Sequence, residues 1–438
     1  MSENENHMLK PLSQREMTKI ARKHQMFLGG KPGGARAVVK DRDLTGLNMR
    51  EMQLQQSDFT GCIMRDSDLT AINFESATLF GCDLSNTVMK NGNFSRTDLR
   101  GADIQNSDLT DANLSGADLR LGSSVLKRKV KEESDQYSEK SHAGQVSFSG
   151  STMRNVKLTN ATAINADFSD AILENVDMRK VDLRDAIFKG ANLSGANMDG
   201  ADLRSANFHA ATLTGAQMEG TEQSNTDFTL ALRDDSDSKV FSEVELSLDE
   251  LLEKHIQWVG SAGKHGQQMD LSGFDMRKLR SLSGKKLTAI TGYETVFADM
   301  NLQRCEFQSA KLDKSDFRGC DLRHSDFRGS QLNDSLFVRA NLQNANFGAL
   351  VFKNPNGTER RMPVALNGAI LRYADCTGSD FRYASFKNAD LTHVNFTDCD
   401  LRHANFDGAI TADIITENAL MTDTLLEQNE VPVEPEEG

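Results

Sequence analysis

Several residue types are scarce in this sequence of 438 residues, and each scarcity narrows the fold. There is one Trp, there are four Tyr, and no apolar run approaches about 18 residues. The chain therefore lacks a candidate membrane span, and its start lacks the pattern of a signal peptide. All Pro residues lie outside the repeats described below, which suits repeats that pair every backbone N–H. They are Pro11, Pro32, Pro355, Pro363, Pro432 and Pro435.

The six Cys form no CxxC pair, and no cluster of Cys and His has the spacing of a zinc site. Cys376 takes the place of a large apolar residue of the repeat, and the others stand two places before one. Such positions point inward, so we predict small packing residues with reduced thiols. Reduced, scattered Cys are typical of the cytoplasm. No metal and no cofactor is expected. The other five are Cys62, Cys82, Cys305, Cys320 and Cys399.

A repeat of five residues fills most of the chain. Residues 102–120 read ADIQNSDLTDANLSGADLR, in which each triplet of the type Ala-Asp-Leu is followed by two small or polar residues. This period is neither the 3.6 residues of a helix nor the 2.0 residues of a plain strand. We call the large apolar residue of each five the centre. The centre and the small residue two places before it are both predicted to point inward.

The frame of five continues over four runs: Val39 to Leu119, Phe148 to Phe228, Leu282 to Phe347 and Leu366 to Phe406. In the second run Phe returns at every fourth centre, and Leu and Met return in the same rhythm at other centres. Four fives therefore make one turn, and stacked turns place like side chains above like. Ladders of Phe and aliphatic side chains then fill the interior without leaving a channel.

The motif of the repeat, A(D/N)LxG, resembles that of the bacterial pentapeptide-repeat family, and the resemblance covers well over half of the residues. It implies an all-β solenoid, the right-handed quadrilateral β-helix of that family, here as two solenoid segments with short α-helical caps. The four-sided turn follows from the sequence itself, whereas the handedness comes from the resemblance alone.

A helical segment precedes each solenoid. Pro11 to Leu28 has a helical pattern and ends at two Gly residues, and Ser247 to Gly260 begins like a capped helix. The apolar side of the second helix is predicted to carry Leu251, Leu252, Ile256 and Val259.

Each helix carries a His followed three residues later by an aromatic residue: His24 and Phe27 in the first, His255 and Trp258 in the second. Many pentapeptide-repeat proteins have a similar His-x-x-Trp helix that leads into the first turn. A helix over the end of a β-helix covers unpaired backbone groups that would otherwise cause aggregation. We therefore predict that these four residues are structural caps. The alternative for the two His is a ligand or a catalytic base.

Two insertions interrupt the runs and are candidate partner-binding elements. The first, residues 120–147, is polar and contains a basic cluster. The second, residues 348–365, reads as a hairpin around Asn-Pro-Asn-Gly. Loops on a rigid scaffold commonly carry function, although a tolerated insertion explains them equally well. The candidate partner-binding residues are Lys127, Arg128, Lys129, Lys131, Phe352, Arg360 and Arg361.

The repeat fades after Phe406, and residues 413–428 are predicted to form a closing helix through which two copies could pair. The expected organisation is a disordered start and capping helix in residues 1–38, a first solenoid in 39–228 with the insertion 120–147, an acidic linker and second capping helix in 229–270, a second solenoid in 271–411 with the hairpin insertion 348–365, and a C-terminal helix and acidic tail in 412–438.

No catalytic constellation is visible. Residues 29–34 lack the Gly-Lys-Ser/Thr of a phosphate-binding loop, and the abundant Asp and Ser follow from the repeat itself. We therefore expect a protein without enzymatic activity. Flat, repetitive solenoid faces favour a scaffold or adaptor that binds one or more protein partners.

An alternative follows from the resemblance, because some pentapeptide-repeat proteins are acidic rods that mimic DNA and bind type II topoisomerases such as gyrase. The net charge of −14 suits this alternative. However, the non-repeat residues 229–253 and 412–438 carry −6 and −8, whereas residues 41–120 carry −6 and residues 271–347 carry +3. Mimicry would therefore be confined to the acidic first solenoid. Direct binding of nucleic acid and association with a membrane are not expected.

Overall fold

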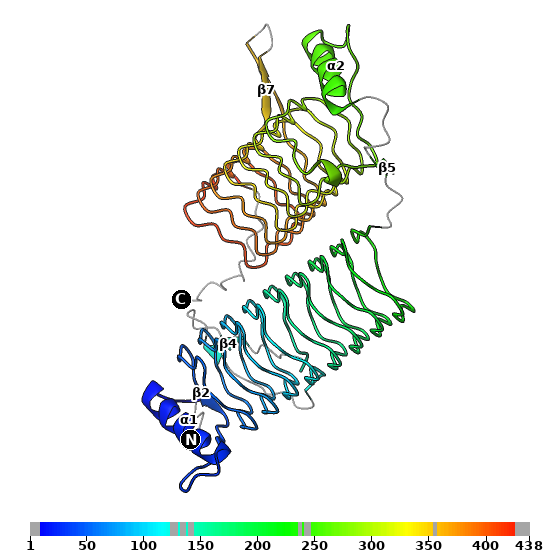
Figure 1. Ribbon diagram of the computed structural model, residues 1–438. Helices are drawn as coiled ribbons and strands as arrows, with labels where there is room; N and C mark the ends of the chain where they lie inside the picture. Colours follow the sequence, from blue (N-terminus) through cyan, green and yellow to red (C-terminus); the bar gives the residue numbers. More distant parts are fainter. Residues whose placement is uncertain are drawn as a thin grey trace, which may run out of the picture. The chain divides into compact units, whose positions relative to one another are not determined.

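A computed structural model describes residues 9–122, 144–234, 239–240, 247–353 and 357–424, and the backbone of residues 130–131 and 137–138. The chain divides into two compact units, Met1–Ser236 (unit 1) and Asp237–Gly438 (unit 2). Each unit has a hydrophobic core of its own. Figure 1 shows that the backbone of each unit winds in stacked coils.

Single parallel β-bridges join each coil to the next. Asp58 bridges Thr78 and Thr78 bridges Asp98, so one coil takes twenty residues. Most bridging residues directly precede a centre, which makes the centre point inward, and Leu79 and Leu99 are accordingly buried. A residue with positive φ, such as Asn86 at 57°, turns the chain at each corner. Asn and Asp are frequent there because their short side chains tolerate this conformation. The β-solenoid predicted from the repeat is confirmed.

Phe side chains form ladders inside both units. In unit 1 the rings of Phe148, Phe168, Phe188, Phe208 and Phe228 stack with centroids 5.0, 4.9, 4.6 and 5.2 Å apart. Unit 2 has two such ladders side by side, whose rings meet edge to face across the interior. Stacked and edge-to-face rings are favourable geometries for aromatic pairs.

The second inward position is the one two places before a centre. Small polar side chains at this position find hydrogen-bond partners inside the coils. The Ser107 hydroxyl donates to the carbonyl oxygen of Leu84 in the coil below (2.8 Å), and the Cys62 thiol donates to that of Val39 (3.2 Å). All six Cys are buried free thiols. Burial raises the pKa of the Cys305 thiol to about 12, so this thiol stays protonated and unreactive.

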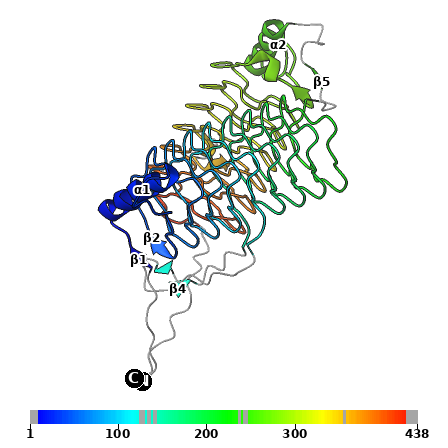
Figure 2. The ribbon, with the colours of Figure 1, turned by 60° about the horizontal axis from the view of Figure 1, so that its bottom comes forward.

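Unit 1 begins with a short strand, a helix and a second short strand. β1 (Lys10–Pro11) pairs in parallel with β2 (Arg42–Asp43), and α1 (Gln14–Leu28) lies between them in sequence. The predicted start of the helix at Pro11 is wrong. Pro11 is extended in β1, and the helix begins at Gln14. Ser13 is the N-cap and forms a capping box with Glu16. Figure 2 shows α1 beside the first coils of unit 1.

Unit 2 begins with the same arrangement. β5 (Lys239–Val240) pairs in parallel with β6 (Phe274–Asp275), and α2 (Leu248–Gly260) follows the N-cap Ser247, which forms a capping box with Glu250. A 3-10 helix, η2 (Arg277–Leu279), comes directly after β6.

The predicted apolar side of α2 is only half correct. Leu252 is buried and Leu251 half-buried, but Ile256 and Val259 are 47% and 38% exposed. The coil contacts the stripe that includes Leu252 and His255, and Ile256 and Val259 lie beyond it.

Two hairpins interrupt the coils. In unit 1, β3 (Val130–Lys131) pairs antiparallel with β4 (Tyr137–Ser138). In unit 2, β7 (Leu350–Lys353) pairs antiparallel with β8 (Glu359–Met362), and Figure 1 shows β7 projecting away from the coils.

The closing helix predicted for residues 413–428 is wrong over its described part. The coil continues to residue 424, where Asn395 bridges Ile415 and Asp400 bridges Leu420. Ile415 and Leu420 occupy outward positions and are 51% and 52% exposed. Apolar residues at outward as well as inward positions gave this segment a helix-like pattern, although its period is still five. Residues 425–428 lie outside the described residues, and 413–424 offers no helix through which two copies could pair.

Candidate interaction surfaces

The two cap histidines are buried and bonded to backbone on both ring nitrogens. His24 Nδ1 accepts from the Ala37 N–H (3.0 Å), and Nε2 lies 2.9 Å from the Gln55 carbonyl oxygen. His255 repeats this geometry with the Met269 N–H (3.1 Å) and the Thr288 carbonyl oxygen (2.9 Å). Because Nδ1 accepts, Nε2 must carry the hydrogen, and each ring is neutral.

These contacts explain why a helix suits this end of a solenoid. The first coil has no coil before it, so part of its backbone lacks the usual partners. His24 occupies one such carbonyl, and the Gln14 amide both donates to the Asn48 carbonyl (2.7 Å) and accepts from the Asn48 N–H (2.9 Å). Each ring uses both of its nitrogens in these backbone contacts. The geometry therefore leaves no free nitrogen for a ligand or for proton transfer.

The neutral histidines predict that acid destabilises both units. Burial lowers the pKa of His24 and of His255 below the ordinary value of 6.5. The unfolded chain takes up these protons near pH 6.5 and the folded chain only at lower pH, so the unfolded state holds more protons in between. The stabilisation is complete above pH 6.5 and is lost as the pH falls through the folded pKa.

Trp258 is the only Trp and reports on the cap of unit 2. We expect the urea midpoint of its fluorescence to fall between about pH 7 and about pH 5. His255→Leu should lower the midpoint at about pH 7 and flatten its dependence on pH. An unchanged pH dependence in this variant would assign the effect to other groups.

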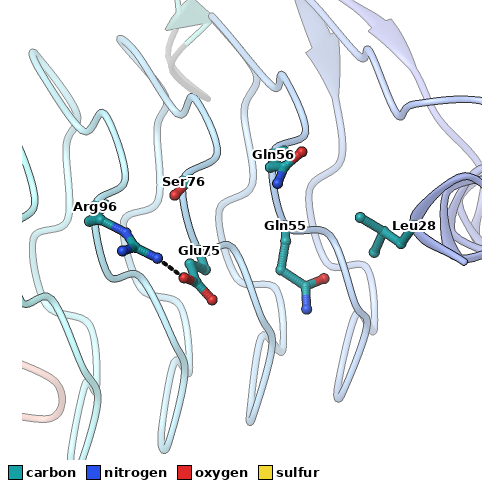
Figure 3. A pocket seen from close by; sticks show the side chains of 6 residues that line it. All are labelled: Leu28, Gln55, Gln56, Glu75, Ser76 and Arg96. Atoms are coloured by element: carbon teal, nitrogen blue, oxygen red, sulfur yellow. Dashed lines mark hydrogen bonds and ion pairs between the residues drawn. The ribbon is translucent and has the colours of Figure 1, made fainter.

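A shallow hollow lies beside α1 (Figure 3). It measures about 290 Å³ and is polar apart from Leu28. Glu75 and Arg96 form an ion pair there, which occupies the carboxylate. The lining offers amide groups and the Ser76 hydroxyl, and its one carboxylate is held by Arg96, so no reaction is assigned to the hollow. Its lining residues are Leu28, Gln55, Gln56, Glu75, Ser76 and Arg96.

The β7–β8 hairpin is anchored at its base and exposed beyond it. A Cβ on Gly329 would lie 2.6 Å from Met362 Cε, so the hairpin base packs tightly on the coil. The Arg361 guanidinium lies over the Tyr383 ring, 4.7 Å from its centroid. Val351 and Phe352 are each 46% exposed. The structure therefore presents two apolar side chains on a fixed support.

The hairpin also gathers positive charge. Phe352 pairs with Arg360 across the two strands, Val351 pairs with Arg361, and Lys353 pairs with Glu359. All three cations are exposed, and Arg361 forms an ion pair with Glu359 (3.2 Å), so Lys353 and Arg360 carry the uncompensated charge. Of the predicted partner-binding residues, the structure thus brings Phe352, Arg360 and Arg361 together.

The predicted basic cluster of the first insertion is not placed in the same way. Lys127, Arg128 and Lys129 lie outside the described residues. Lys131 belongs to β3, of which only the backbone is described. No surface is assigned to these four residues.

Aspartates along the coils are paired with an Arg two residues later. In Asp321–Arg323 the Oδ2–Nη2 distance is 2.7 Å, and Arg323 lowers the pKa of that carboxyl. Each pair places a cation beside a carboxylate, so negative and positive groups alternate along these faces. The other pairs are Asp98–Arg100, Asp118–Arg120, Asp177–Arg179, Asp182–Arg184, Asp202–Arg204, Asp275–Arg277, Asp316–Arg318, Asp326–Arg328, Asp380–Arg382 and Asp400–Arg402.

The described residues lack both a metal-binding cluster and a membrane-spanning helix. They hold no group of three His, Cys, Asp or Glu side chains close enough to share a metal ion. Neither α1 nor α2 has the length and apolar character that a membrane crossing demands.

Models of known protein families match the segments that form the coils. A family model described as a pentapeptide repeat region matches residues 36–125 and 281–347. A second model, described as pentapeptide repeats in eight copies, matches residues 147–185, 186–222, 364–398 and 384–411. The chain belongs to the pentapeptide-repeat family. The matches to this pentapeptide-repeat protein end at residue 411, and its capping helices lie outside them. No curated protein matches the chain.

Solved structures of pentapeptide-repeat proteins are among its structural neighbours. Rfr23 from the cyanobacterium Cyanothece 51142 is 21% identical over 34% of this chain and 90% of its own, with a TM-score of 0.17. QnrB1, a plasmid-mediated fluoroquinolone resistance protein, is 19% identical over 45% and 93%, with a TM-score of 0.21. HetL from Nostoc sp. strain PCC 7120, involved in heterocyst differentiation regulation, is 17% identical over 95% and 98%, with a TM-score of 0.11.

One charged surface of this pentapeptide-repeat protein was not predicted from the sequence. Four exposed cations, Arg15, Lys19, Arg22 and Lys23, lie on α1. Their spacing of three and four residues within a predicted helix is the signal that identifies them as one stripe.

Proposed function

We propose that this chain is a non-enzymatic scaffold of the cytoplasm that holds a protein partner on the β7–β8 hairpin of unit 2. The observation that carries the proposal is the exposure of Val351 and Phe352 on a hairpin whose base is fixed. We take the coils to be right-handed and four-sided, as the family resemblance implies.

The coil does not need this hairpin for its own packing. Phe347 before the hairpin stacks on Phe381 after it at 4.8 Å, much as Phe327 stacks on Phe347 at 4.7 Å without an insertion. The core is therefore continuous across the insertion. Exposed apolar side chains that contribute nothing to the core suit an interaction with another protein.

The exposed side chains of the hairpin indicate which kind of partner surface would fit it. Phe352 and Val351 supply apolar contacts, and Lys353 and Arg360 favour a surface with acidic groups around an apolar patch, whereas Arg361 is ion-paired with Glu359. The sheet has two strands, so an extended segment of the partner can also add along an edge of β7 or β8.

The alternative, mimicry of DNA by unit 1, has weaker support. Mimicry needs a regular field of uncompensated negative charge. In unit 1, Asp98, Asp118 and Asp182 are paired with Arg two residues later. The same face thus presents cations between its carboxylates.

The test is co-purification from the native host with tagged full-length protein and two variants. The first variant is Val351→Ser/Phe352→Ser/Arg360→Glu. The second, a matched control, reverses the exposed charges Lys157→Glu and Lys180→Glu on the coils of unit 1. We expect one stoichiometric partner that is retained by the control and reduced at least about tenfold by the hairpin variant.

Circular dichroism should show the same unfolding for all three proteins, since the changed side chains are exposed. Retention of the partner by the hairpin variant would refute the hairpin as the docking site. Recovery of topoisomerase subunits with both variants, together with inhibition of gyrase supercoiling, would favour mimicry. Turnover abolished by one substitution would exclude a non-enzymatic scaffold.

A further inference from the structure

The two capping modules provide an internal comparison. α1 and α2 share a capping box, a buried His with two backbone partners and a flanking parallel strand pair. Their exposed charges are opposite. α1 carries four cations, Arg15, Lys19, Arg22 and Lys23, and one acid, Glu16, whereas α2 carries three acids and one Lys. Both helices close the same kind of end, so capping does not require the cations of α1.

The cations of α1 also work against the helix. Arg15 and Lys19, and Lys19 and Lys23, are like charges four residues apart, which repel. Arg15 lies in the first turn, where the helix dipole disfavours a cation, and no basic residue lies in the last turn. The dipole favours the acids in the first turn of both helices, Glu16 in α1 and Asp249 and Glu250 in α2. Helix stability therefore explains the first-turn acids of both helices but not the four cations of α1.

Within the described residues these four cations also lack a carboxylate partner, which sets them apart from the paired Arg of the coils. None of them forms an ion pair with a carboxylate in the part of the chain that the structure describes. On the coils, in contrast, many Arg side chains form an ion pair with the Asp two residues before them. An exposed stripe of free cations about 12 Å long is a surface for an anionic partner.

Apolar side chains continue the stripe. Residues 15, 19, 23 and 27 lie one turn apart, and Phe27 at the end of this row is 41% exposed. Leu28 next to it is 37% exposed, and Val38 is 56% exposed. We define the α1 surface as Arg15, Lys19, Arg22, Lys23, Phe27 and Leu28.

The chemistry of the α1 surface favours an acidic protein segment over a membrane or a nucleic acid. Insertion into a membrane would need the apolar side of α1, but Met17 and His24 on that side are buried in unit 1. A long nucleic acid would extend over the coils that follow, where residues 41–70 carry a net charge of −3. A short acidic segment with apolar side chains meets both the cations and Phe27.

We propose that the α1 surface binds the C-terminal segment of a second copy of this chain, residues 425–438. This segment has five Glu, no Lys and no Arg, so its charge complements the stripe. Leu425, Leu426, Val431 and Val433 supply the apolar contacts for Phe27 and Leu28. A second copy can reach α1 whatever the arrangement of the two units within one chain. Binding of one copy's end to the next copy's start links copies head to tail.

The test uses a labelled peptide of residues 425–438 and the chain that ends at residue 424. We expect the peptide to bind with micromolar affinity at about 0.05 M salt, and at least about tenfold more weakly at about 0.5 M, because salt screens exposed charges. Arg15→Glu/Lys19→Glu/Arg22→Glu/Lys23→Glu should abolish binding. The control Lys157→Glu/Lys180→Glu should leave it unchanged.

The full chain distinguishes a second copy from other occupants. In sedimentation at about 0.05 M salt we expect dimers or longer chains that dissociate at about 0.5 M and are absent in the α1 variant. Peptide binding by a full chain that stays monomeric would place the contact within one copy and overturn the proposal. Failure of the peptide to bind would also overturn it, and binding of anionic vesicles or duplex DNA that the α1 variant loses would identify a different partner. The α1 variant keeps like charges four residues apart with the opposite sign, so we expect it to unfold at about the same temperature as the unchanged chain in circular dichroism.

Discussion

Phe188→Ala is expected to lower the free energy of unfolding of unit 1 by about 3–5 kcal/mol. The Phe188 ring is fully buried and stacks on Phe168 at 4.9 Å and on Phe208 at 4.6 Å. Truncation removes both stacking contacts and leaves a cavity that the coils above and below cannot close, since their own bridges hold them in place.

The two separate cores provide the control for this prediction. Trp258 lies in unit 2, so its fluorescence follows unit 2, whereas circular dichroism follows both units. Phe188→Ala should shift one circular dichroism transition and leave the Trp258 midpoint unchanged. Phe327→Ala, in a ladder of unit 2, should shift the Trp258 midpoint. Equal shifts of both signals in either variant would show that the units unfold together.

Gly266→Ala is expected to disrupt the cap of unit 2. Gly266 has φ of +78°, and a Cβ there would lie 2.1 Å from the Lys254 carbonyl oxygen and 2.7 Å from the Trp258 backbone nitrogen. The loop must move away from α2, which breaks the hydrogen bond from the Gln267 N–H to Lys254 (3.1 Å). Backbone strain and overlap together should cost about 2–5 kcal/mol.

Gly273→Ala separates these two costs. Gly273 also has a positive φ, +73°, but a Cβ there would have no neighbour within 4 Å. This variant should cost only about 1–2 kcal/mol, the strain of a left-handed Ala. Urea midpoints from Trp258 fluorescence measure both effects. If the two variants lose equal stability, the close approach of the loop to α2 is not responsible.

The repeat could be predicted in detail because in a solenoid one residue position has one environment. Centres such as Leu99 and second inward positions such as Cys62 are buried, as their place in the five requires. The register between coils follows directly, since a shift by one residue would turn every centre outward.

The ends and excursions could not be predicted in the same way. At the C-terminal end, Ile415 and Leu420 carry apolar side chains at outward positions, so composition suggested a helix where the period of five continues. In α2, Ile256 and Val259 continue an apolar pattern beyond the part of the helix that contacts the coil. Local sequence does not encode where such a contact ends.

The candidate surfaces, too, could be predicted only in part from the sequence. The sequence identified Phe352, Arg360 and Arg361 because an insertion is visible as a break in the period. It could not show that Arg361 lies over Tyr383, because that contact joins the hairpin to a later coil. The pairing of Asp with Arg two residues later was visible as a recurring Asp-x-Arg, but its effect on the charge of a face depends on the distance between the groups.

The continuous stacking of Phe347 on Phe381 has a consequence for how such a protein can change. The chain leaves the coil and re-enters it on the same side, so the segment between them is free to vary in length and composition without any compensating change in the core. With the hairpin as the proposed docking site, recognition and core stability can be changed separately in unit 2. A lineage, or an experimenter, can exchange the whole β7–β8 excursion for another and acquire a new specificity in a single step on an unaltered scaffold.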